Sequence, residues 1–194
     1  MNPENAHKKT YHHGDLRAAL VAEGLRLVAE RDAEALSLRE VARGVGVTAT
    51  SVYRHFPDKQ ALLAALAREG LDRLAQAQRD AQAGAGGGKA GFAATGRAYV
   101  RFALANPGLF RLIFASPDIG AVKKDGVLDS DAGQLLRANA AAEAKHHGSQ
   151  DEHGTTIRAW AIVHGLAMLM LDGQVAPDDG LIERVIGVNG CAGM

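Results

Sequence analysis

The sequence of 194 residues predicts an all-α fold, and three observations lead to that prediction. Apolar residues recur every three to four positions, as Leu16, Leu20 and Leu27 do near the start of the chain. No segment shows the alternation of apolar and polar residues that marks a half-buried strand. Alanine and glycine are abundant while aromatic residues make up only 5%, a mixture that suits closely packed helices better than a β-sandwich. We therefore expect a small N-terminal helical domain at 15–60, followed by a larger helical domain.

Four helices are expected in the first half of the chain. The polar segment 1–14 is expected to be a tail, either disordered in solvent or ordered as an arm, and Asp15 is the predicted cap of a helix that ends near residue 31. Ser37 and Glu40 form a capping-box pattern that opens a second helix, and Gly46 ends it. A third helix is expected from Thr48 to Pro57. Asp58 caps a fourth, over 59–83, of which 61–83 connects the two domains. The tail holds the basic and histidine residues His7, Lys8, Lys9, His12 and His13.

A glycine-rich segment at 84–91 marks the clearest change of composition, and it is predicted to be a flexible loop before a second domain at 92–190. Helices are expected there at 92–105, 108–116, 129–146, 155–171 and 178–188. Between them lie a predicted loop at 118–128 and a polar connector at 146–154.

Charge and composition exclude several classes of protein. The 22 basic residues balance the 22 acidic ones, and residues 1–59 hold nine Lys and Arg against eight Asp and Glu, so any nucleic-acid contact must come from a local patch. The sequence contains no run of about 18 apolar residues, so no membrane span is expected. The polar N-terminus lacks the apolar core of a secretory signal. The single cysteine, Cys191, cannot form an intrachain disulfide, so a cytoplasmic location is expected.

Residues 37–59 have the layout of a helix-turn-helix DNA reader. The second helix of such a unit enters the major groove, and the first must pack closely against it across a tight turn. Ala42, Gly44 and Gly46 are small enough for that close approach. The apolar contact is expected from Val41, Val45, Val47 and Val52.

The residue types in this stretch suit contacts with DNA. The short side chains of Thr48, Ala49, Thr50 and Ser51 let the backbone approach the base edges, and a methyl group there can touch a thymine methyl. Tyr53, His55 and Lys59 suit phosphate contacts. Arg39 reaches either a base edge or the backbone, whereas Arg54 is a weaker candidate. The predicted contact residues are Ser37, Arg39, Thr48, Ala49, Thr50, Ser51, Tyr53, His55 and Lys59.

Over residues 15–66 the chain resembles the TetR family of one-component bacterial transcriptional regulators. The pattern that carries the resemblance is Ser37, Arg39, Val41-Ala42, Gly46-Val47, Val52-Tyr53, His55-Phe56 and Lys59. The resemblance implies that Thr48, Ala49, Thr50 and Tyr53 face the bases, while Ser37, Tyr53, His55 and Lys59 hold phosphates. It gives Phe56 a structural role in locking the recognition helix onto the first helix. The alternative is a helical hairpin inside a bundle core, in which Tyr53 only packs.

The second half of the chain resembles the C-terminal domains of one subgroup of the same family. The two stretches concerned are WAIVHGLAMLMLDG at 160–173, with a Trp-His-Gly signature, and ALANPGLFRLIFAS at 103–116. The resemblance implies a homodimer built through the last two long helices, which form a four-helix bundle at the two-fold axis. Independently, 155–171 and 178–188 are too apolar for lone surface helices.

A ligand pocket is expected between the C-terminal helices, although for each candidate residue taken singly ordinary core is the favoured interpretation. His164 is the most polar of them and either binds a ligand atom or bonds a backbone carbonyl. No charged residue lies between Ala159 and Leu171, so an effector on this face should be apolar or weakly polar. The candidates are Phe102, Phe110, Ile113, Phe114, Trp160, His164, Met168 and Met170.

Metal and enzyme hypotheses receive little support from the sequence. His146, His147 and His153 do not have the spacing of a zinc motif, and a solvated loop is the favoured interpretation. No nucleophile elbow or phosphate-cradling loop is present, so neither an enzyme nor a cofactor is expected. The leading hypothesis is a dimeric repressor that binds a palindromic operator and is released by a small molecule. The alternatives are an activator, a ligand-independent DNA binder, and a helical interaction module without DNA binding.

Overall fold

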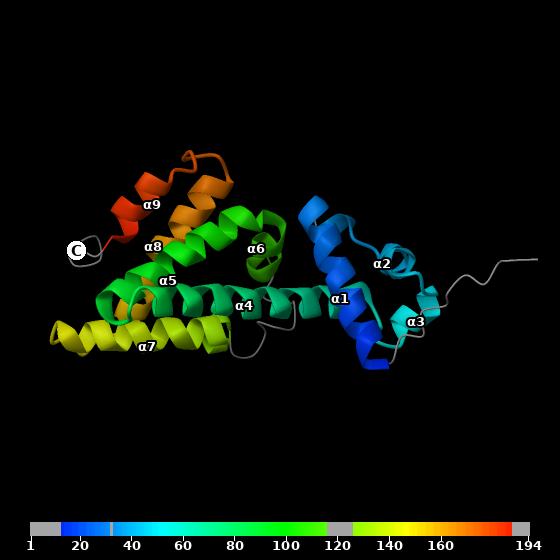
Figure 1. Ribbon diagram of the computed structural model, residues 1–194, viewed down its shortest axis with the longest axis horizontal. Helices are drawn as coiled ribbons and strands as arrows, with labels where there is room; N and C mark the ends of the chain where they lie inside the picture. Colours follow the sequence, from blue (N-terminus) through cyan, green and yellow to red (C-terminus); the bar gives the residue numbers. More distant parts are fainter. Residues whose placement is uncertain (1–12, 32, 116–125, 188–194) are drawn as a thin grey trace, which may run out of the picture.

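The computed structural model describes residues 13–31, 33–115 and 126–187 of the chain, and within these ranges every regular element is helical, which confirms the all-α fold. Two short 3-10 turns accompany the α-helices, η1 (Ala33–Ala35) and η2 (Val127–Asp129). The α-helices are α1 (His13–Glu30), α2 (Leu38–Val45), α3 (Ala49–Tyr53), α4 (Lys59–Gly84), α5 (Gly88–Ala105), α6 (Pro107–Phe114), α7 (Asp131–His146), α8 (Glu152–Leu171) and α9 (Asp179–Ile186) (Figure 1).

The first three helices and the start of α4 form a head at one end of the molecule (Figure 1). Its core is built from Leu20, Val41, Val52, Phe56 and Leu62, each no more than 2% exposed. These residues recur on the inward faces of their helices, which is why such short helices hold together.

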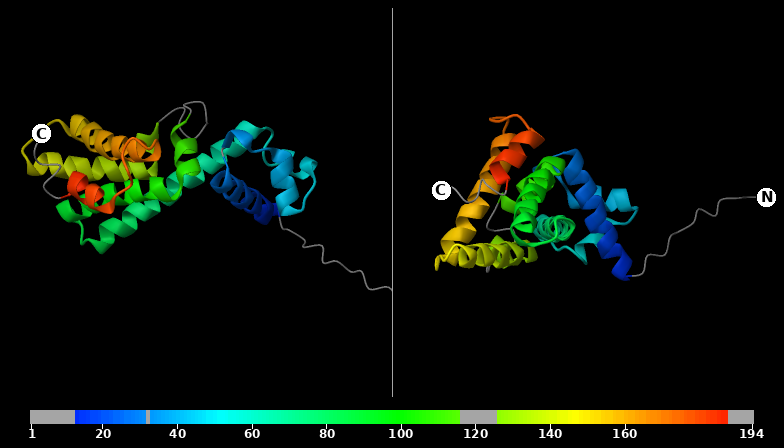
Figure 2. Two further views of the ribbon diagram at one scale, coloured as in Figure 1. Left: turned by 90° about the horizontal axis from the view of Figure 1, so that it is seen from above. Right: turned by 60° about the vertical axis from the view of Figure 1, so that its left-hand side comes forward.

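Helix α4 joins the head to the second domain, as both figures of the ribbon show (Figures 1 and 2). Its first turns bury Leu62 and Leu66 in the head, while Leu74 and Ala75 belong to the core of the second domain. There α4, α5, α7 and α8 pack around a common core, and α9 lies on α5. Arg101 of α5 holds α9 through Asp179 and Glu183, at 3.0 and 3.1 Å.

The boundaries of several helices differ from the predicted ones, and α1 begins at His13 instead of being capped by Asp15. The segment 84–91, expected as a flexible loop, contributes Gly84 to α4 and its second half to α5, which leaves a three-residue turn at 85–87. Gly86 and Gly87 adopt positive φ angles there, so glycine is needed for a tight turn rather than for a long linker. Helix α3 ends at Tyr53, before the predicted end, and α8 begins three residues early at Glu152.

Helix α6 is wedged between the head and the second domain. A side-chain carbon at Gly108 would collide with the backbone carbonyl oxygen of Val28 at the end of α1. A Cβ at Gly70 of α4 would lie 2.8 Å from side-chain carbons of Leu109 and Ile113. The absence of side chains at these two glycines therefore lets α1, α4 and α6 approach one another closely.

Some predictions fall outside the described residues. They are those for Cys191, for residues 118–125 of the loop, and for His7, Lys8, Lys9 and His12 of the tail.

Candidate nucleic-acid interface and ligand cavity

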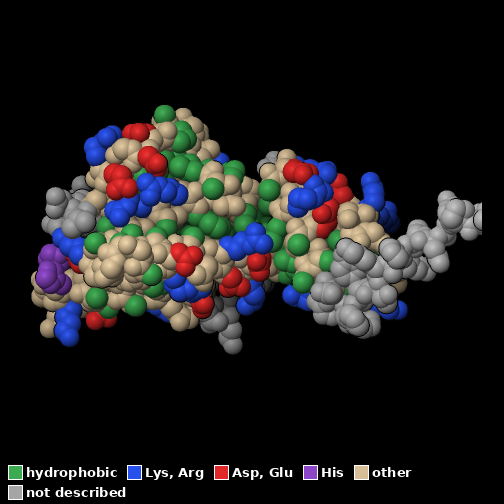
Figure 3. Space-filling view, in the orientation of Figure 1, with side chains coloured by type: hydrophobic (Ala, Val, Ile, Leu, Met, Phe, Trp, Pro, Cys, Tyr) green, Lys and Arg blue, Asp and Glu red, His purple; other side chains and the backbone are tan. Residues whose placement is uncertain are grey.

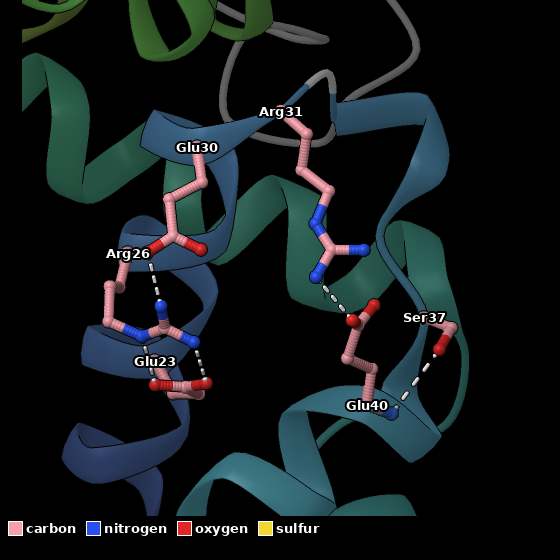
Figure 4. A network of polar contacts seen from close by, with 6 residues as sticks. All are labelled: Glu23, Arg26, Glu30, Arg31, Ser37 and Glu40. Carbon is pink, nitrogen blue, oxygen red and sulfur yellow. Dashed lines mark hydrogen bonds and ion pairs between the residues drawn. The ribbon is translucent and has the colours of Figure 1, made fainter.

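The start of α2 is fixed by two polar contacts (Figure 4). The Ser37 hydroxyl accepts a hydrogen bond from the backbone N–H of Glu40 at 3.2 Å, as the capping-box pattern predicts. The Glu40 carboxylate pairs with Arg31, which follows α1. The Ser37 side chain therefore caps α2, while the Glu40 side chain attaches the start of α2 to the end of α1. Ser37 and Arg39 remain exposed there.

The turn between α2 and α3 depends on Gly46. This residue has the left-handed conformation, with φ of 76°, which glycine adopts without strain. The N–H groups of Gly46 and Val47 donate to the carbonyls of Arg43 and Ala42, at 3.1 and 2.9 Å, and close the end of α2. Gly46 thus reverses the chain tightly enough for α3 to pack against α2.

Gly44 serves a different contact from the predicted one. A side chain at Gly44 would collide with the carboxylate of Glu23 in α1, so this glycine allows α1 and α2, not α2 and α3, to approach closely. Glu23 is held in place by Arg26 through two hydrogen bonds of 2.7 and 2.8 Å (Figure 4). These bonds lower the pKa of the Glu23 carboxyl group and keep it ionised.

Helix α3 buries one side and exposes the other. Val52 is fully buried, whereas Thr50 and Tyr53, three positions apart and therefore neighbours on the helix surface, are exposed. Tyr53 is 47% exposed, and it is the one aromatic among the exposed large apolar side chains of the described residues. The ring and hydroxyl group of Tyr53 are therefore accessible to a ligand on this side of α3.

The hydroxyl groups at the start of α3 are partly engaged within the helix. Thr48 Oγ1 accepts from the Ser51 N–H at 3.3 Å and lies 3.0 Å from the Ser51 hydroxyl. Both side chains therefore cap α3 and orient its N-terminus. A hydroxyl has one donor and two acceptor positions, so each can still bond a base or a phosphate.

Lys59 and His55 lie at the other end of the motif and are half-buried. The Lys59 ammonium donates to the backbone carbonyl of Glu34 in η1, a contact that the sequence did not reveal. Two of its three donors remain, so this contact orients the ammonium without removing it from phosphate binding.

The nine predicted contact residues thus divide into two groups by their exposure to solvent. Ser37, Arg39, Thr48, Thr50 and Tyr53 are exposed, whereas Ala49, Ser51, His55 and Lys59 are half-buried. Phe56 is 2% exposed inside the head, and the Arg17 guanidinium of α1 lies 5.3 Å from its ring centre. The burial of Phe56 agrees with its predicted structural role. Nothing in the sequence around Arg17 indicated that its guanidinium group would lie over the Phe56 ring.

The second domain contains a mostly apolar cavity between α4, α5, α7 and α8. Its free space is about 50 Å³. The wall includes Leu74 and Gln78 of α4, Phe92 and Tyr99 of α5, Leu136 of α7 and Trp160 of α8. Its charged members are Lys89, which is half-buried, and Glu143, whose side chain is 13% exposed.

The residues predicted to line a pocket lie mostly elsewhere, and only Trp160 belongs to this wall. Phe110 and Ile113 are fully buried in the core, and Phe102 borders a shallow open groove between α4 and α5. Phe114, His164 and Met168 are half-buried beside the core, and Met170 is buried within it. Gln78 was not among the predicted pocket residues. A polar side chain on the apolar side of α4 is the feature of the sequence that could have indicated it.

A chain of hydrogen bonds joins the cavity wall to the aromatic cluster behind it. The Trp160 indole N–H donates to the Tyr99 hydroxyl oxygen at 3.3 Å, and that hydroxyl lies 2.8 Å from His164 Nδ1. The Tyr99 oxygen accepts from Trp160, and the direction of its bond with Nδ1 is set by the tautomer of the His164 ring. Burial raises the pKa of Tyr99 and lowers that of His164, so both groups are uncharged at neutral pH.

The histidines at the far end of α7 are exposed, and Figure 3 shows them as a patch at one end of the molecule. His147 pairs with Glu143 of its own helix at 3.0 Å. In the described part of the chain, no group of three or more His, Cys, Asp or Glu side chains is arranged to hold a metal ion.

Both halves of the chain match models of known protein families. Residues 20–66 match the model for bacterial regulatory proteins of the tetR family, and residues 92–187 match the tetracyclin repressor-like C-terminal domain.

Solved structures are similar over nearly the whole chain. A Rhodococcus sp. RHA1 protein with unknown function is 32% identical, with 95% of this chain and 96% of that chain covered and a TM-score of 0.74. A TetR family transcription regulator from Marinobacter aquaeolei VT8 is 21% identical, with coverage of 91% and 94% and a TM-score of 0.64. A tetR-family transcriptional regulator from Streptomyces coelicolor is also 21% identical, with coverage of 88% and 76% and a TM-score of 0.65. The last two likenesses show a shared fold.

Proposed function

Because the chain belongs to the TetR family of bacterial regulatory proteins, we propose that it is a cytoplasmic repressor that binds a palindromic operator as a homodimer and is released by a small effector. The observation that carries the DNA-binding part is the surface of α3 and the start of α2. Thr50, Tyr53 and Arg39 are exposed there, while Val41 and Val52 behind them are buried. An apolar base with a polar and aromatic outer face suits a helix that enters the major groove.

The charge distribution supports a local contact rather than broad attraction. Basic and acidic side chains are mixed over the face of the molecule in Figure 3, and the net charge of the chain is zero. The attraction to DNA is therefore expected from individual basic side chains of the motif, such as Arg39 and Lys59. Specificity is expected from methyl contacts and DNA shape, because the base-facing side chains are small.

The second domain supports control by a ligand. Its cavity is about 50 Å³, much smaller than the roughly 300–1,000 Å³ of common ligand pockets, so an effector must part the surrounding helices in order to enter. Helix α4 lines this cavity and also begins in the core of the head. A bound effector would thereby favour a state in which the two heads of the dimer no longer match the spacing of the operator half-sites. The Trp-His-Gly stretch, which resembles one subgroup of these domains, belongs to the same proposal.

The test compares two variants that each lose one positive charge. Arg39→Ala removes an exposed guanidinium from the proposed interface, and Arg73→Ala removes one from α4, where Arg73 pairs with Glu69 at 2.9 Å. Affinity for a fragment of the region upstream of the gene is measured by fluorescence anisotropy at several salt concentrations.

We expect Arg39→Ala to weaken binding and to reduce the slope of log affinity against log salt by about one, while Arg73→Ala changes neither. Tyr53→Ala should weaken binding at every salt concentration. Wild-type binding that does not depend on salt, or equal behaviour of the two arginine variants, would contradict the proposed interface.

A further inference from the structure

The cavity of the second domain contains one polar group that the protein leaves without a partner. Gln78 of α4 is 6% exposed and forms part of the cavity wall. Its side-chain carbonyl oxygen Oε1 has no hydrogen-bond partner among the described residues. Buried carbonyl groups in native proteins are nearly always paired, so an unpaired one in a cavity wall indicates a missing partner.

The contact at its other end favours one orientation of this amide. Gln78 Nε2 donates to the backbone carbonyl of Thr95 in α5 at 3.4 Å. The reversed orientation would place two oxygen acceptors against each other, which is repulsive. The group that Gln78 offers to a ligand is therefore an acceptor.

The other polar groups of the buried wall are already paired. The Thr95 hydroxyl donates to the Phe92 carbonyl at 2.7 Å. The Tyr99 hydroxyl and the Trp160 N–H bond within the chain that ends at His164. The charged members are Lys89, which is half-buried, and Glu143, whose side chain is 13% exposed and pairs with His147 at 3.0 Å. Among the described side chains of this wall, Gln78 Oε1 is thus the buried acceptor that has no partner.

From this chemistry we infer that the effector is a neutral, mostly apolar molecule with one hydroxyl or N–H group, which donates a hydrogen bond to Gln78 Oε1. This inference rests on the proposed function, because it takes the cavity as the effector site. A carboxylate is excluded from that position since it offers only acceptors and would face Gln78 Oε1 with oxygen against oxygen. A slender molecule is favoured because the cavity is small.

The experiment uses three probes of equal length: octan-1-ol, the ether 1-methoxyheptane, which lacks the donor, and octanoate, which is charged. Trp160 is the single tryptophan of the chain and lies in the cavity wall, so its fluorescence reports binding of each probe without any DNA present. We expect octan-1-ol to bind about 5- to 100-fold more tightly than the ether, the range for leaving a buried acceptor unpaired, and more tightly than octanoate.

Two variants test whether Gln78 causes the preference for the alcohol over the ether. Gln78→Met replaces the amide by an apolar side chain of similar length and should abolish the preference for the alcohol over the ether. Gln82→Met makes the same change one turn further along α4, where the side chain bonds Asn139 at 2.8 Å, and should leave the preference intact. Thermal unfolding followed by circular dichroism shows that both variants are folded.

Equal binding of the alcohol and the ether to the wild type, or an unchanged preference in a folded Gln78→Met variant, would overturn the inference. Neither result bears on DNA binding, which the Arg39 and Arg73 variants test separately. If DNA binding fails while the alcohol preference depends on Gln78, the cavity chemistry stands and the repressor proposal does not.

Discussion

At the scale of single residues, the polar groups of the second domain matter more than its aromatic groups for hydrogen bonding and for the response to pH. The sequence singled out His164 as a ligand contact or a partner of a backbone carbonyl. In the structure His164 instead shares a hydrogen bond with the Tyr99 hydroxyl and packs among Phe110, Phe114 and Trp160, with ring centres between 4.8 and 6.0 Å from its own. This position connects the cavity wall to the core, so the protonation state of His164 influences the stability of the domain.

The first prediction concerns the effect of pH on that stability. The pKa of His164 is lowered by burial in the folded protein, so the unfolded chain binds more protons in the range just below the ordinary value of about 6.5. Unfolding free energy should therefore be fully retained above pH 6.5 and should decrease as the pH falls below it.

The measurement is urea unfolding between pH 8 and 5.5, for the wild type and for His164→Asn. The asparagine amide can still bond Tyr99 but does not titrate in this range. The part of the pH dependence that belongs to His164 should disappear in the variant. An identical slope in both proteins would show that another group is responsible.

At the scale of elements, helix patterns in the sequence predicted most helices to within a few residues, and local rules explain why. Ser37, Thr48 and Asp58 each accept a backbone N–H at the start of α2, α3 and α4. Such caps are local in sequence and therefore visible in it.

The contacts that the sequence could not show are those between distant segments. Gly44 faces Glu23, Lys59 bonds Glu34, and Gly108 lies against Val28. The cavity is of the same kind, because four helices from different parts of the chain build its wall. A glycine that allows two helices to approach and a glycine that closes a turn look the same in a sequence, and only their neighbours distinguish them.

The second prediction concerns α6, which connects three parts of the molecule. It contacts α1 through Gly108, α4 through Leu109 and Ile113, and the end of α8 through the ion pair of Arg111 and Asp172. A methyl group in Gly108→Ala would collide with a backbone atom of Val28, which cannot rotate away as a side chain can. We expect the variant to lose about 1–3 kcal/mol of unfolding free energy, as is usual for overpacking.

Gly84→Ala is the matched control, because Gly84 ends α4 and a Cβ there would meet nothing within 4 Å. That variant should be neutral or more stable by up to about 1 kcal/mol. Urea unfolding at one fixed protein concentration compares the two. Equal stabilities would mean that the contact between α1 and α6 is loose, and that α6 does not hold the head.

At the scale of the whole molecule, α8 is the helix that leaves much of its apolar surface unburied within one chain. By length and composition it alone among the described helices could cross a membrane, yet it packs against α5 and α7 as part of the bundle. Only 22% of its most apolar 18-residue window is buried. Ile157, Ile162 and Leu169 are 39, 36 and 46% exposed. The small residues Ala161 and Gly165 lie between Ile157 and Leu169 at four-residue spacing, which would allow another helix to approach closely.

Helix α9 contributes less apolar surface than the resemblance implied. It spans eight residues, and Ile182 and Ile186 are buried within the protomer. The proposed dimer must therefore rely mainly on α8, with α9 at its side. Two recognition helices related by a two-fold axis could then bind half-sites about one helical turn apart.

The third prediction tests this arrangement with Leu169→Lys. In a dimer built on α8 the new ammonium group would be buried without a partner, which should raise the dissociation constant of the dimer at least ~10-fold. Ala142→Lys places the same charge on an exposed position of α7 and should leave assembly unchanged. Analytical ultracentrifugation over a range of protein concentrations measures both.

Affinity for the palindromic fragment should fall together with dimerisation in Leu169→Lys, because one head contacts only one half-site. The probe binding reported by Trp160 should persist, since Leu169 is not part of the cavity wall. A Leu169→Lys protein that remains as dimeric as Ala142→Lys would place the dimer interface elsewhere, and the exposed apolar side of α8 would then require a different partner.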